Sequence, residues 1–254
     1  MESNREWQHW GAKDPLWAVS SVRGKRRGDP AAWSKEEFVA YGAADWVSIR
    51  RQWEHYGLGS HHGRRRVIEI GCGAGRMTGP LLTAFESVLA VDVSQGMLEQ
   101  ARTLLADKAN NVEFVLVDDP AIPAARGSCD GVFSTHVFQH LSDPAGVKKY
   151  LSLAFEALAR GASLCLHFPV SGAHREAQFN RLRLRPHFLW NHMFHAVQFM
   201  LRRTGILSHW EYRVFQANDV FRMLNESGYT DLEMRIFDLA SMGEAHSFFF
   251  ARRP

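Results

Sequence analysis

Three closely spaced glycines follow an apolar run directly, and an acid lies two residues before the first of them. The run is Val67–Ile70, the acid is Glu69, and the glycines are Gly71, Gly73 and Gly75. A glycine turn after a strand lets the backbone pass very close to a bound ligand. The turn that holds a dinucleotide pyrophosphate needs another glycine at the position of Arg76, so the spacing disfavours NAD.

A second acid follows the next apolar run, about twenty residues further on. Val88–Val91 ends in Asp92. A carboxylate in this position can accept two hydrogen bonds from the vicinal hydroxyls of a ribose. The glycine turn and Asp92 together therefore indicate a cofactor that contains a nucleoside.

With these residues the chain resembles the class I S-adenosylmethionine-dependent methyltransferases. The similarity continues in the family's order and spacing through NVEFVLVDDPAIP, SCDGVFSTHVFQHLSDP and GASLCLHFP, and it covers roughly residues 64–169. The resemblance implies an α/β fold, a Rossmann-like doubly wound sheet of seven strands. It also implies S-adenosylmethionine as the cofactor and S-adenosylhomocysteine as the product.

The resemblance assigns roles along the motifs. The glycine turn bends around the methionine portion with Glu69 bracing it, Asp92 holds the ribose, and Asp118 contacts the adenine amino group. Asp119 offers a backbone amide, and the segment from Ser134 turns a carbonyl toward the cofactor's amino group. The cofactor-binding residues expected in this way are Glu69, Gly71, Cys72, Gly73, Gly75, Asp92, Val93, Met97, Asp118, Asp119 and Ser134.

Two histidines after the fourth expected strand are candidates for the chemistry. Methyl transfer is an in-line displacement, so a base is needed only for a poorly nucleophilic acceptor. His140 is the first candidate for that base, and a packing role is the alternative. His136 either shares the catalytic role or lines the cofactor pocket.

The pattern of potential ligands predicts no metal. The pairs His61–His62 and His192–His195 have no carboxylate or cysteine at ligand spacing, and near the fourth strand Asp143 stands alone. The three cysteines are far apart in sequence and are typical of buried thiols in a reducing compartment. We therefore expect a metal-independent enzyme.

The positioning elements follow from alternating apolar runs and helical stretches, which favour a parallel sheet between helices. Asp130, just before the fourth strand, is expected to stabilise a turn rather than to react. A helix near 218–227 precedes a closing hairpin. The expected strands are Val67–Ile70, Val88–Val91, Val112–Val117, Gly131–Ser134, Ser163–Phe168, Leu232–Phe237 and Ser247–Ala251.

Length and composition set the class of protein. The chain has 254 residues with 46% apolar side chains and a net charge of +3, which suits one main domain and does not indicate a nucleic-acid partner. No apolar signal core or run long enough to span a membrane occurs, so a cytoplasmic location is expected.

Residues 1–63 are expected to form an aromatic-rich helical extension ahead of the methyltransferase domain at 64–254. Ser34 and Glu37 form a capping box, and the helix after it has an apolar face with an interruption near Gly42. Such aromatic faces usually belong to the core. Resembling enzymes often cover the cofactor with this segment, so Trp10 and Trp17 are candidates for lining the pocket.

An insertion at about 171–213 is expected to form a helical lid. It has seven arginines, two acids and many aromatic residues, and residues 189–202 have the pattern of an amphipathic helix. The helix either packs on the sheet or meets an apolar substrate or a membrane interface, with arginines binding an acidic group. The substrate-binding candidates here are Arg175, Arg181, Trp190 and Tyr212.

These patterns predict a methyltransferase that modifies an oxygen or nitrogen atom of a small molecule, which could carry an acidic group. Two alternatives remain: a membrane-surface enzyme that modifies a lipid or quinone, and a cofactor-binding subunit without catalysis. A nucleic-acid acceptor is disfavoured, because no recognition module is appended. The acceptor atom, pathway and oligomeric state are not specified.

Overall fold

The structure is a computed structural model that describes residues 2–20, 25, 29, 33–58, 65–118, 120–141, 143–171, 213–241 and 244–254. The predicted lid helix and the four lid candidates Arg175, Arg181, Trp190 and Tyr212 lie outside the described residues. Asp119 lies outside them as well. The described part contains most of the segment that carries the motifs.

A seven-stranded sheet forms the centre of the molecule, with strand order β3-β2-β1-β4-β5-β7-β6. Strands β1 to β5 are parallel to one another, and β7 runs antiparallel to both β5 and β6. The predicted fold class and closing hairpin are confirmed. The strands are β1 Arg66–Ile70, β2 Ser87–Asp92, β3 Val112–Leu116, β4 Cys129–Ser134, β5 Leu158–His167, β6 Thr230–Leu239 and β7 Glu244–Arg252.

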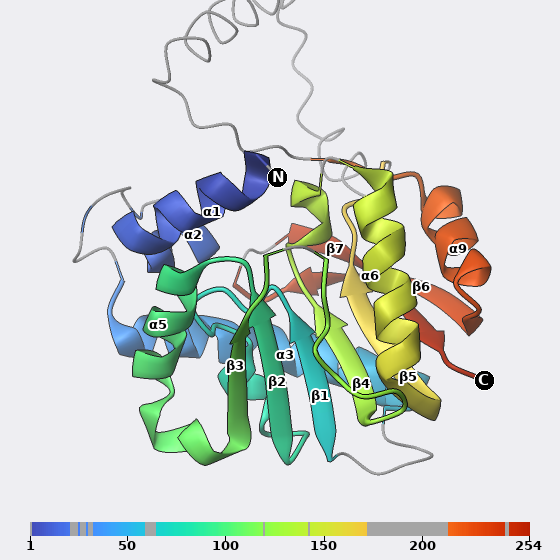
Figure 1. Ribbon diagram of the computed structural model, residues 1–254, viewed down its shortest axis with the longest axis horizontal. Helices are drawn as coiled ribbons and strands as arrows, with labels where there is room; N and C mark the ends of the chain where they lie inside the picture. The colour runs from blue at the N-terminus through green and yellow to red at the C-terminus, as the bar shows by residue number, and fades with distance from the viewer. Residues whose placement is uncertain are drawn as a thin grey trace, which may run out of the picture.

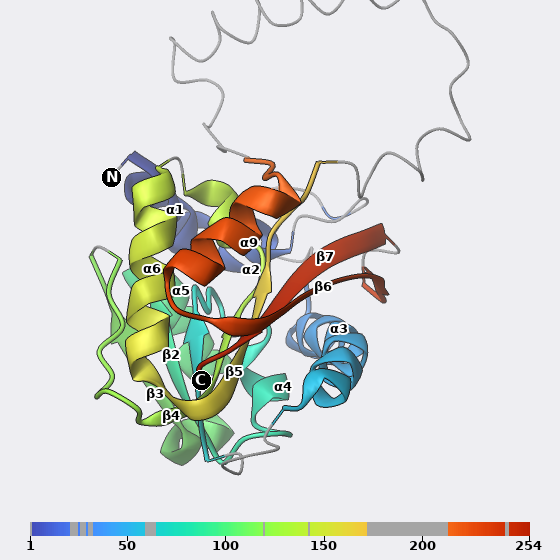
Figure 2. The ribbon, with the colours of Figure 1, turned by 90° about the vertical axis from the view of Figure 1, so that its right-hand side faces the viewer.

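Helices cover both faces of this sheet. In Figure 2, α6 and α9 lie on one side of the strands, and α3 and α4 lie on the other. The helices are α1 Glu2–Lys13, α2 Pro15–Val19, α3 Lys35–Tyr56, α4 Thr78–Leu81, α5 Gln95–Leu104, α6 Pro144–Ala157 and α9 Ala217–Glu226, with 3-10 turns at Ala106–Asn111 and Phe138–His140.

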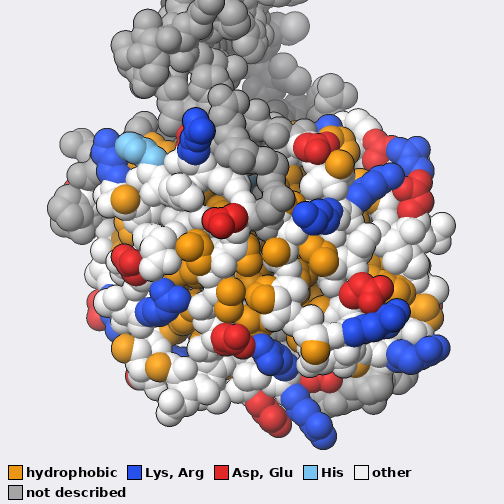
Figure 3. Space-filling model, in the orientation of Figure 1, with side chains coloured by type: hydrophobic (Ala, Val, Ile, Leu, Met, Phe, Trp, Pro, Cys, Tyr) orange, Lys and Arg blue, Asp and Glu red, His pale blue; other side chains and the backbone are white. Residues whose placement is uncertain are grey.

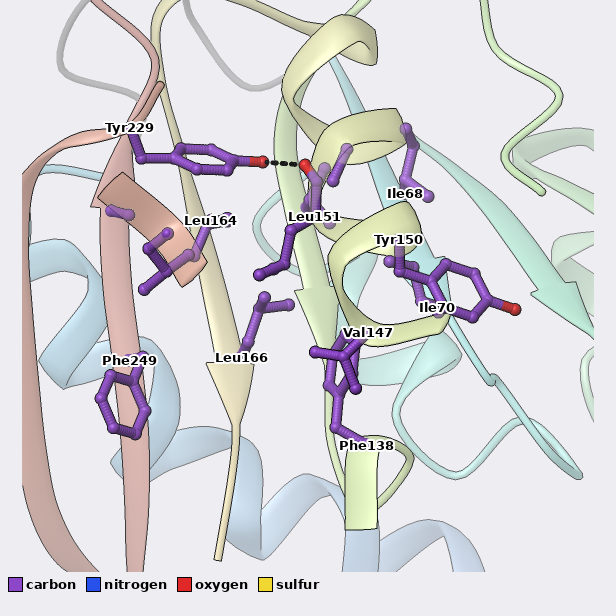
Figure 4. Packing of buried hydrophobic residues seen from close by; sticks show 14 of the residues in the cluster. Ile68, Ile70, Phe138, Val147, Tyr150, Leu151, Leu164, Leu166, Tyr229 and Phe249 are labelled. Atoms are coloured by element: carbon purple, nitrogen blue, oxygen red, sulfur yellow. Dashed lines mark hydrogen bonds between the residues drawn. The ribbon is translucent and has the colours of Figure 1, made fainter. Parts of the chain in front are cut away.

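The face of the sheet under α6 carries the larger apolar cluster. Val147, Leu151 and Ala154 recur along one side of α6 and are fully buried against strand residues such as Leu164. Figure 4 shows Tyr229 reaching this helix, where its hydroxyl donates a hydrogen bond to the Leu151 carbonyl oxygen at 3.0 Å. Burying each large apolar side chain contributes roughly 1.5–3 kcal/mol, so this layer holds the ends of β1 and β4 rigidly.

The predicted capping box is present at the start of α3, where Ser34 and Glu37 satisfy each other's backbone amides. The expected interruption near Gly42 is wrong, because α3 runs unbroken over 22 residues. A Cβ at this glycine would lie 2.1 Å from the Arg76 carbonyl oxygen. Gly42 therefore allows the helix to approach the glycine turn closely.

The first two helices, whose bounds the sequence analysis did not give, lie at one end of the sheet near α5 (Figure 1). The approach is tight at Gly11, where a Cβ would lie 2.1 Å from Ser94 Oγ. Trp10 is 1% exposed and packs into the same cluster as Trp17. The segment before α3 is thus packed onto the start of α5, while the division of the chain at residue 63 stays a prediction.

The surface seen in Figure 3 has apolar side chains gathered between β3 and α6 and charged side chains around them. Away from that region, Asp130 accepts hydrogen bonds from the backbone amides of Arg65 and Arg66 at 2.9 and 3.0 Å. The predicted structural role of Asp130 is confirmed. No helix in the described part of the chain has the length and apolar character that crossing a membrane requires.

Candidate active site

A cavity lies where β1, β2 and β4 end, in the position that open parallel α/β sheets use for ligands. Its floor comes from the glycine turn and the segments after β2 and β4. Part of its wall comes from the N-terminal segment through Asn4, Trp7, Ala18 and Val19. The N-terminal helices therefore cover the pocket, as the resemblance implied, although through other residues than Trp10 and Trp17.

The glycine turn owes its shape to three left-handed residues, with φ of 69° at Gly71, 53° at Gly73 and 87° at Gly75. Side chains strongly disfavour this conformation. The amides of Gly71 and Cys72 both donate to the Val91 carbonyl oxygen, at 2.8 and 3.1 Å, which ties the turn to β2. The backbone of the turn can thus approach a ligand in the cavity.

Glu69 braces the turn from inside the protein. Its side chain is buried and accepts a hydrogen bond from the Thr78 hydroxyl at 2.6 Å. Burial raises the pKa of the Glu69 carboxyl to about 8, against a smaller lowering by the Thr78 hydroxyl. Glu69 is therefore mostly uncharged at neutral pH, and it lines the cavity as a hydrogen-bonding group.

Asp92 is placed to hold a diol. One carboxylate oxygen accepts the Gly73 amide at 2.8 Å and the other accepts the Ser94 amide at 2.9 Å. A carboxylate has about four acceptor positions in all, so Asp92 can accept further hydrogen bonds beyond these two. Burial raises the pKa of Asp92 to about 6 while the backbone hydrogen bonds lower it, so the group is mainly ionised at neutral pH.

The segment after β4 contributes His136 and His140 to the lining of the cavity. His136 has a φ of 58°, a left-handed conformation that is uncommon outside glycine and that concentrates at functional sites. Burial, and after it the neighbouring His167 and Arg76, lowers the pKa of His136 well below the usual value. His136 is therefore neutral at physiological pH.

His140 is buried and held from two sides. Its Nε2 lies 3.0 Å from Nε2 of Gln139, and its ring meets the Trp7 ring edge to face, with centroids 5.0 Å apart. Because the amide nitrogen of Gln139 can only donate, Nε2 of His140 accepts this hydrogen bond, and in the neutral ring the proton lies on Nδ1. The imidazole is thus held in one orientation, and Nε2 could act as a base only after its contact with Gln139 is exchanged for one with the acceptor.

Arg76, at the position where a dinucleotide turn has glycine, also lines the cavity. Its guanidinium forms a buried ion pair with Asp45 at 2.6 Å, and Asp45 accepts hydrogen bonds from the Ser241 amide and hydroxyl at 2.9 and 2.7 Å. Breaking such a buried pair by removing one partner typically costs about 3–5 kcal/mol. The pair ties the glycine turn to α3 and to the turn after β6.

Eight of the predicted site residues lie on the cavity wall. They are Glu69, Gly71, Cys72, Gly73, Asp92, Val93, His136 and His140.

Six predicted residues within the described part do not line the cavity. The Asp118 side chain is exposed, and the backbone carbonyl oxygen of Asp118 accepts a hydrogen bond from the side-chain amide of Asn4 at 2.7 Å. Ser134 is buried, and its hydroxyl donates to the Ile70 carbonyl oxygen at 2.9 Å. Gly75 packs against α5, and Met97, Trp10 and Trp17 belong to an apolar cluster beneath the N-terminal helices.

Sequence reasoning missed Trp7 and the pair His167 and His246, which lie beside His136. A helix over residues 2–13 places Trp7 one turn before Trp10 on the same side, and this pattern would have added Trp7 to the candidates. No sequence signal brings His167 and His246 together, because they lie on β5 and β7.

Comparison with known proteins agrees with this geometry. Residues 67–161 match the family model described as a methyltransferase domain. This segment is a methyltransferase domain. The predicted resemblance to the class I family is thereby confirmed.

A curated relative and two solved structures give the extent of the likeness. Ubiquinone biosynthesis O-methyltransferase of Sinorhizobium fredii is 33% identical over 78 residues, 31% of this chain and 32% of that protein. Magnesium protoporphyrin IX methyltransferase of Synechocystis PCC 6803, with bound S-adenosylhomocysteine, aligns with a TM-score of 0.61 at 15% identity over 99% of this chain and 100% of that one. N-methyltransferase NodS of Bradyrhizobium japonicum, with the same ligand, aligns with a TM-score of 0.60 at 16% identity over 100% of both chains. The curated match spans about a third of that relative's length, and the two structural likenesses establish the fold.

Proposed function

We propose that the protein is an S-adenosylmethionine-dependent methyltransferase that acts on an oxygen or nitrogen atom of a small molecule. The observation that carries the proposal is the setting of Asp92: backbone amides fix both carboxylate oxygens, and the residue lines a cavity that begins at the glycine turn. Two adjacent fixed acceptors match the two hydroxyls of the ribose.

In the proposed reaction, the cavity holds the acceptor in line with the sulfonium methyl group. The acceptor loses its proton to His140, its lone pair forms the bond to the methyl carbon, and the carbon–sulfur bond breaks to leave the neutral thioether. The neutral imidazole is the form that accepts the proton. Positioning supplies most of the acceleration, because displacement at a sulfonium needs little other assistance.

The proposed acceptor has an apolar body and could carry an acidic group. Val93, Leu141 and Tyr150 line the cavity, so an apolar body would be accommodated. The guanidinium of Arg76, the one arginine among the described lining residues, is already paired with Asp45. The lid residues Arg175 and Arg181, outside the described residues, are the proposed partners for an acidic group. A cytoplasmic location stays a prediction.

Labelled methyl transfer to a panel of hydroxylated, amino and carboxylated aromatic and aliphatic molecules tests the proposal. We expect label to enter at least one acceptor class and the Asp92→Ala variant to lose that transfer. A protein that binds the cofactor but transfers no label to any acceptor would favour a non-catalytic, cofactor-binding subunit.

A lipid or quinone acceptor is the second candidate, favoured by the similarity to the ubiquinone biosynthesis O-methyltransferase of Sinorhizobium fredii. This acceptor requires approach to a membrane surface, for which the basic composition of residues 171–213 is suited. Co-sedimentation with anionic vesicles at low and high salt decides between the two. Absence of binding at low salt would remove the membrane-surface alternative.

A further inference from the structure

Three histidines from distant parts of the sequence meet beside the cavity. His136 follows β4, His167 ends β5 and His246 lies in β7, and these strands are neighbours in the sheet. One ring nitrogen from each lies within 4.8 Å of one ring nitrogen from each of the others. The ring of His136 is centred 4.5 Å from that of His167 and 5.2 Å from that of His246.

His136 connects this cluster to the cavity. Its side chain lines the cavity, and its Nε2 atom is buried without a hydrogen-bond partner among the described residues. Leaving a buried polar atom unsatisfied costs about 1–3 kcal/mol, and the left-handed backbone at this residue adds a further cost. Both features indicate a position built to receive a ligand.

The other two histidines have the spacing of ligands that share an ion. Nε2 of His167 lies 3.2 Å from Nδ1 of His246. Two nitrogens bound to one tetrahedral Zn²⁺ at about 2.0–2.1 Å lie about 3.3 Å apart. In the metal-free protein these nitrogens share a hydrogen bond. When Nε2 of His167 binds a metal ion, its proton moves to Nδ1, which can then no longer accept the backbone amide of His136. That contact is 3.4 Å long, so losing it costs little.

We propose that His136, His167 and His246 form a binding site for a divalent transition-metal ion, with Zn²⁺ as the best match, whose fourth position faces the cavity. Three imidazoles without a carboxylate suit zinc and its neighbours and do not suit Mg²⁺ or Ca²⁺. Three histidines with an open position resemble catalytic rather than structural zinc sites. The fourth position would take a water molecule or the heteroatom of an acceptor.

The site deepens the proposed function, on which its role toward the acceptor rests. A hydroxyl bound to the ion would lose its proton more readily and would be held beside the methyl group. Metal binding itself does not depend on methyl transfer and can be measured alone. It opposes the prediction of metal independence, which considered only histidines adjacent in sequence.

The experiment titrates the chelator-treated full chain with Zn²⁺ by calorimetry and with Co²⁺ by visible absorption. We expect one equivalent to bind, with the intense absorption bands of tetrahedral Co²⁺. His167→Gln and His246→Gln should weaken binding about a hundredfold or more. The matched control is His55→Gln on the exposed side of α3, which should bind as the wild type does.

A second pair of variants keeps the test decisive. His136→Asn introduces a residue that also tolerates the left-handed backbone. We therefore expect this variant to fold even if the substitutions at His167 and His246 unfold the protein. Zn²⁺ should raise the melting temperature of the wild type and not that of His136→Asn. The double variant His192→Gln, His195→Gln changes the other histidine pair and should retain binding.

Two results would overturn the site: no stoichiometric ion in the wild type, or binding that disappears in the double variant and survives in His136→Asn. The first would leave the three rings as a histidine hydrogen-bond chain. Titration of the same samples with S-adenosylhomocysteine reports the cofactor site separately. Failure of the metal site can therefore be told apart from failure of the proposed function.

Discussion

Burial shifts pKa values in opposite directions in two parts of the cavity wall: the glycine turn with Asp92, and the segment that carries His136 and His140. On the wall formed by the glycine turn and Asp92, burial raises the carboxyl pKa values, to about 8 for Glu69 and about 6 for Asp92. On the histidine wall, burial lowers the pKa of His136. Each wall is moved toward its uncharged form, so at neutral pH Asp92 remains as the main ionised carboxylate of the first wall.

The walls differ in how they are built. The first consists of backbone amides and carbonyls locked by positive φ angles, with Asp92 accepting two of those amides. The second consists of imidazoles fixed by other side chains, such as Gln139 and Trp7 around His140. The difference suggests that the first wall holds a constant cofactor and the second handles the proton and the acceptor.

The largest expected effect belongs to the histidine wall. His140→Ala should lower kcat about a hundredfold or more with the best acceptor, because a general base contributes roughly 10²–10⁴. Affinity for S-adenosylhomocysteine should stay nearly unchanged. Steady-state kinetics across pH and a parallel titration check both, with the exposed His55→Ala as the control. An unchanged kcat would assign His140 to packing against Trp7.

The glycine wall is tested by Asp92→Ala. Two hydrogen bonds to a charged acceptor contribute about 1.5 kcal/mol or more each, so cofactor affinity should fall roughly a hundredfold. Asp130→Ala is the matched control, since Asp130 also accepts two backbone amides but does not line the cavity. It should lose stability and retain affinity. Equal losses of affinity in both variants would contradict a ribose role for Asp92.

The packing of the N-terminal helices over the cavity is tested by Gly11→Ala in α1. A Cβ there would lie 2.1 Å from Ser94 Oγ and 3.0 Å from the Met97 amide, so α1 must shift away from α5. Overpacking of this kind costs about 1–3 kcal/mol, and we expect a roughly tenfold loss of cofactor affinity. Gly146→Ala in α6, where the nearest atom is 3.9 Å away, is the control for calorimetry and thermal unfolding.

A smaller effect comes from the Glu69 carboxyl. Its pKa is raised from 4.5 to about 8, so the folded ligand-free protein holds this proton more tightly than the unfolded chain does. The stabilisation is complete below the unfolded pKa and is lost as the pH rises through about 8. Glu69→Gln should reduce the loss of unfolding free energy between pH 5 and pH 9, because the variant has no carboxyl group to titrate at this position. Denaturant unfolding at both pH values measures it against Glu36→Gln, and an unaltered difference would contradict the burial effect.

The first wall could be predicted from the sequence because it is local. Val67 to Asp92 contain a strand, the turn and the next strand, so spacing alone specifies which backbone atoms meet. The second wall could not, because His167 and His246 approach His136 only through the order of β4, β5 and β7. A period-2 strand pattern gives a residue's face but not its neighbour in the sheet.

The N-terminal cover shows the same limit at a smaller scale. The sequence predicts that tryptophans from this segment line the pocket, but it does not give the bounds of the helix Glu2–Lys13 or the side of it that faces the cavity. In the structure Trp7, and not Trp10, lines the cavity. The predicted interruption at Gly42 is wrong for a related reason. Glycine weakens a helix on its own, but here the contact with the Arg76 carbonyl requires it, and packing outweighs propensity.

Calorimetric titration with S-adenosylmethionine and S-adenosylhomocysteine, with NAD as the control, tests the central claim most directly. The turn and Asp92 predict micromolar binding of both adenosyl ligands and no binding of NAD, because Arg76 occupies the position where a pyrophosphate turn has glycine. Binding of NAD alone, or of none of the three by the folded protein, would contradict the assignment of this cavity to S-adenosylmethionine.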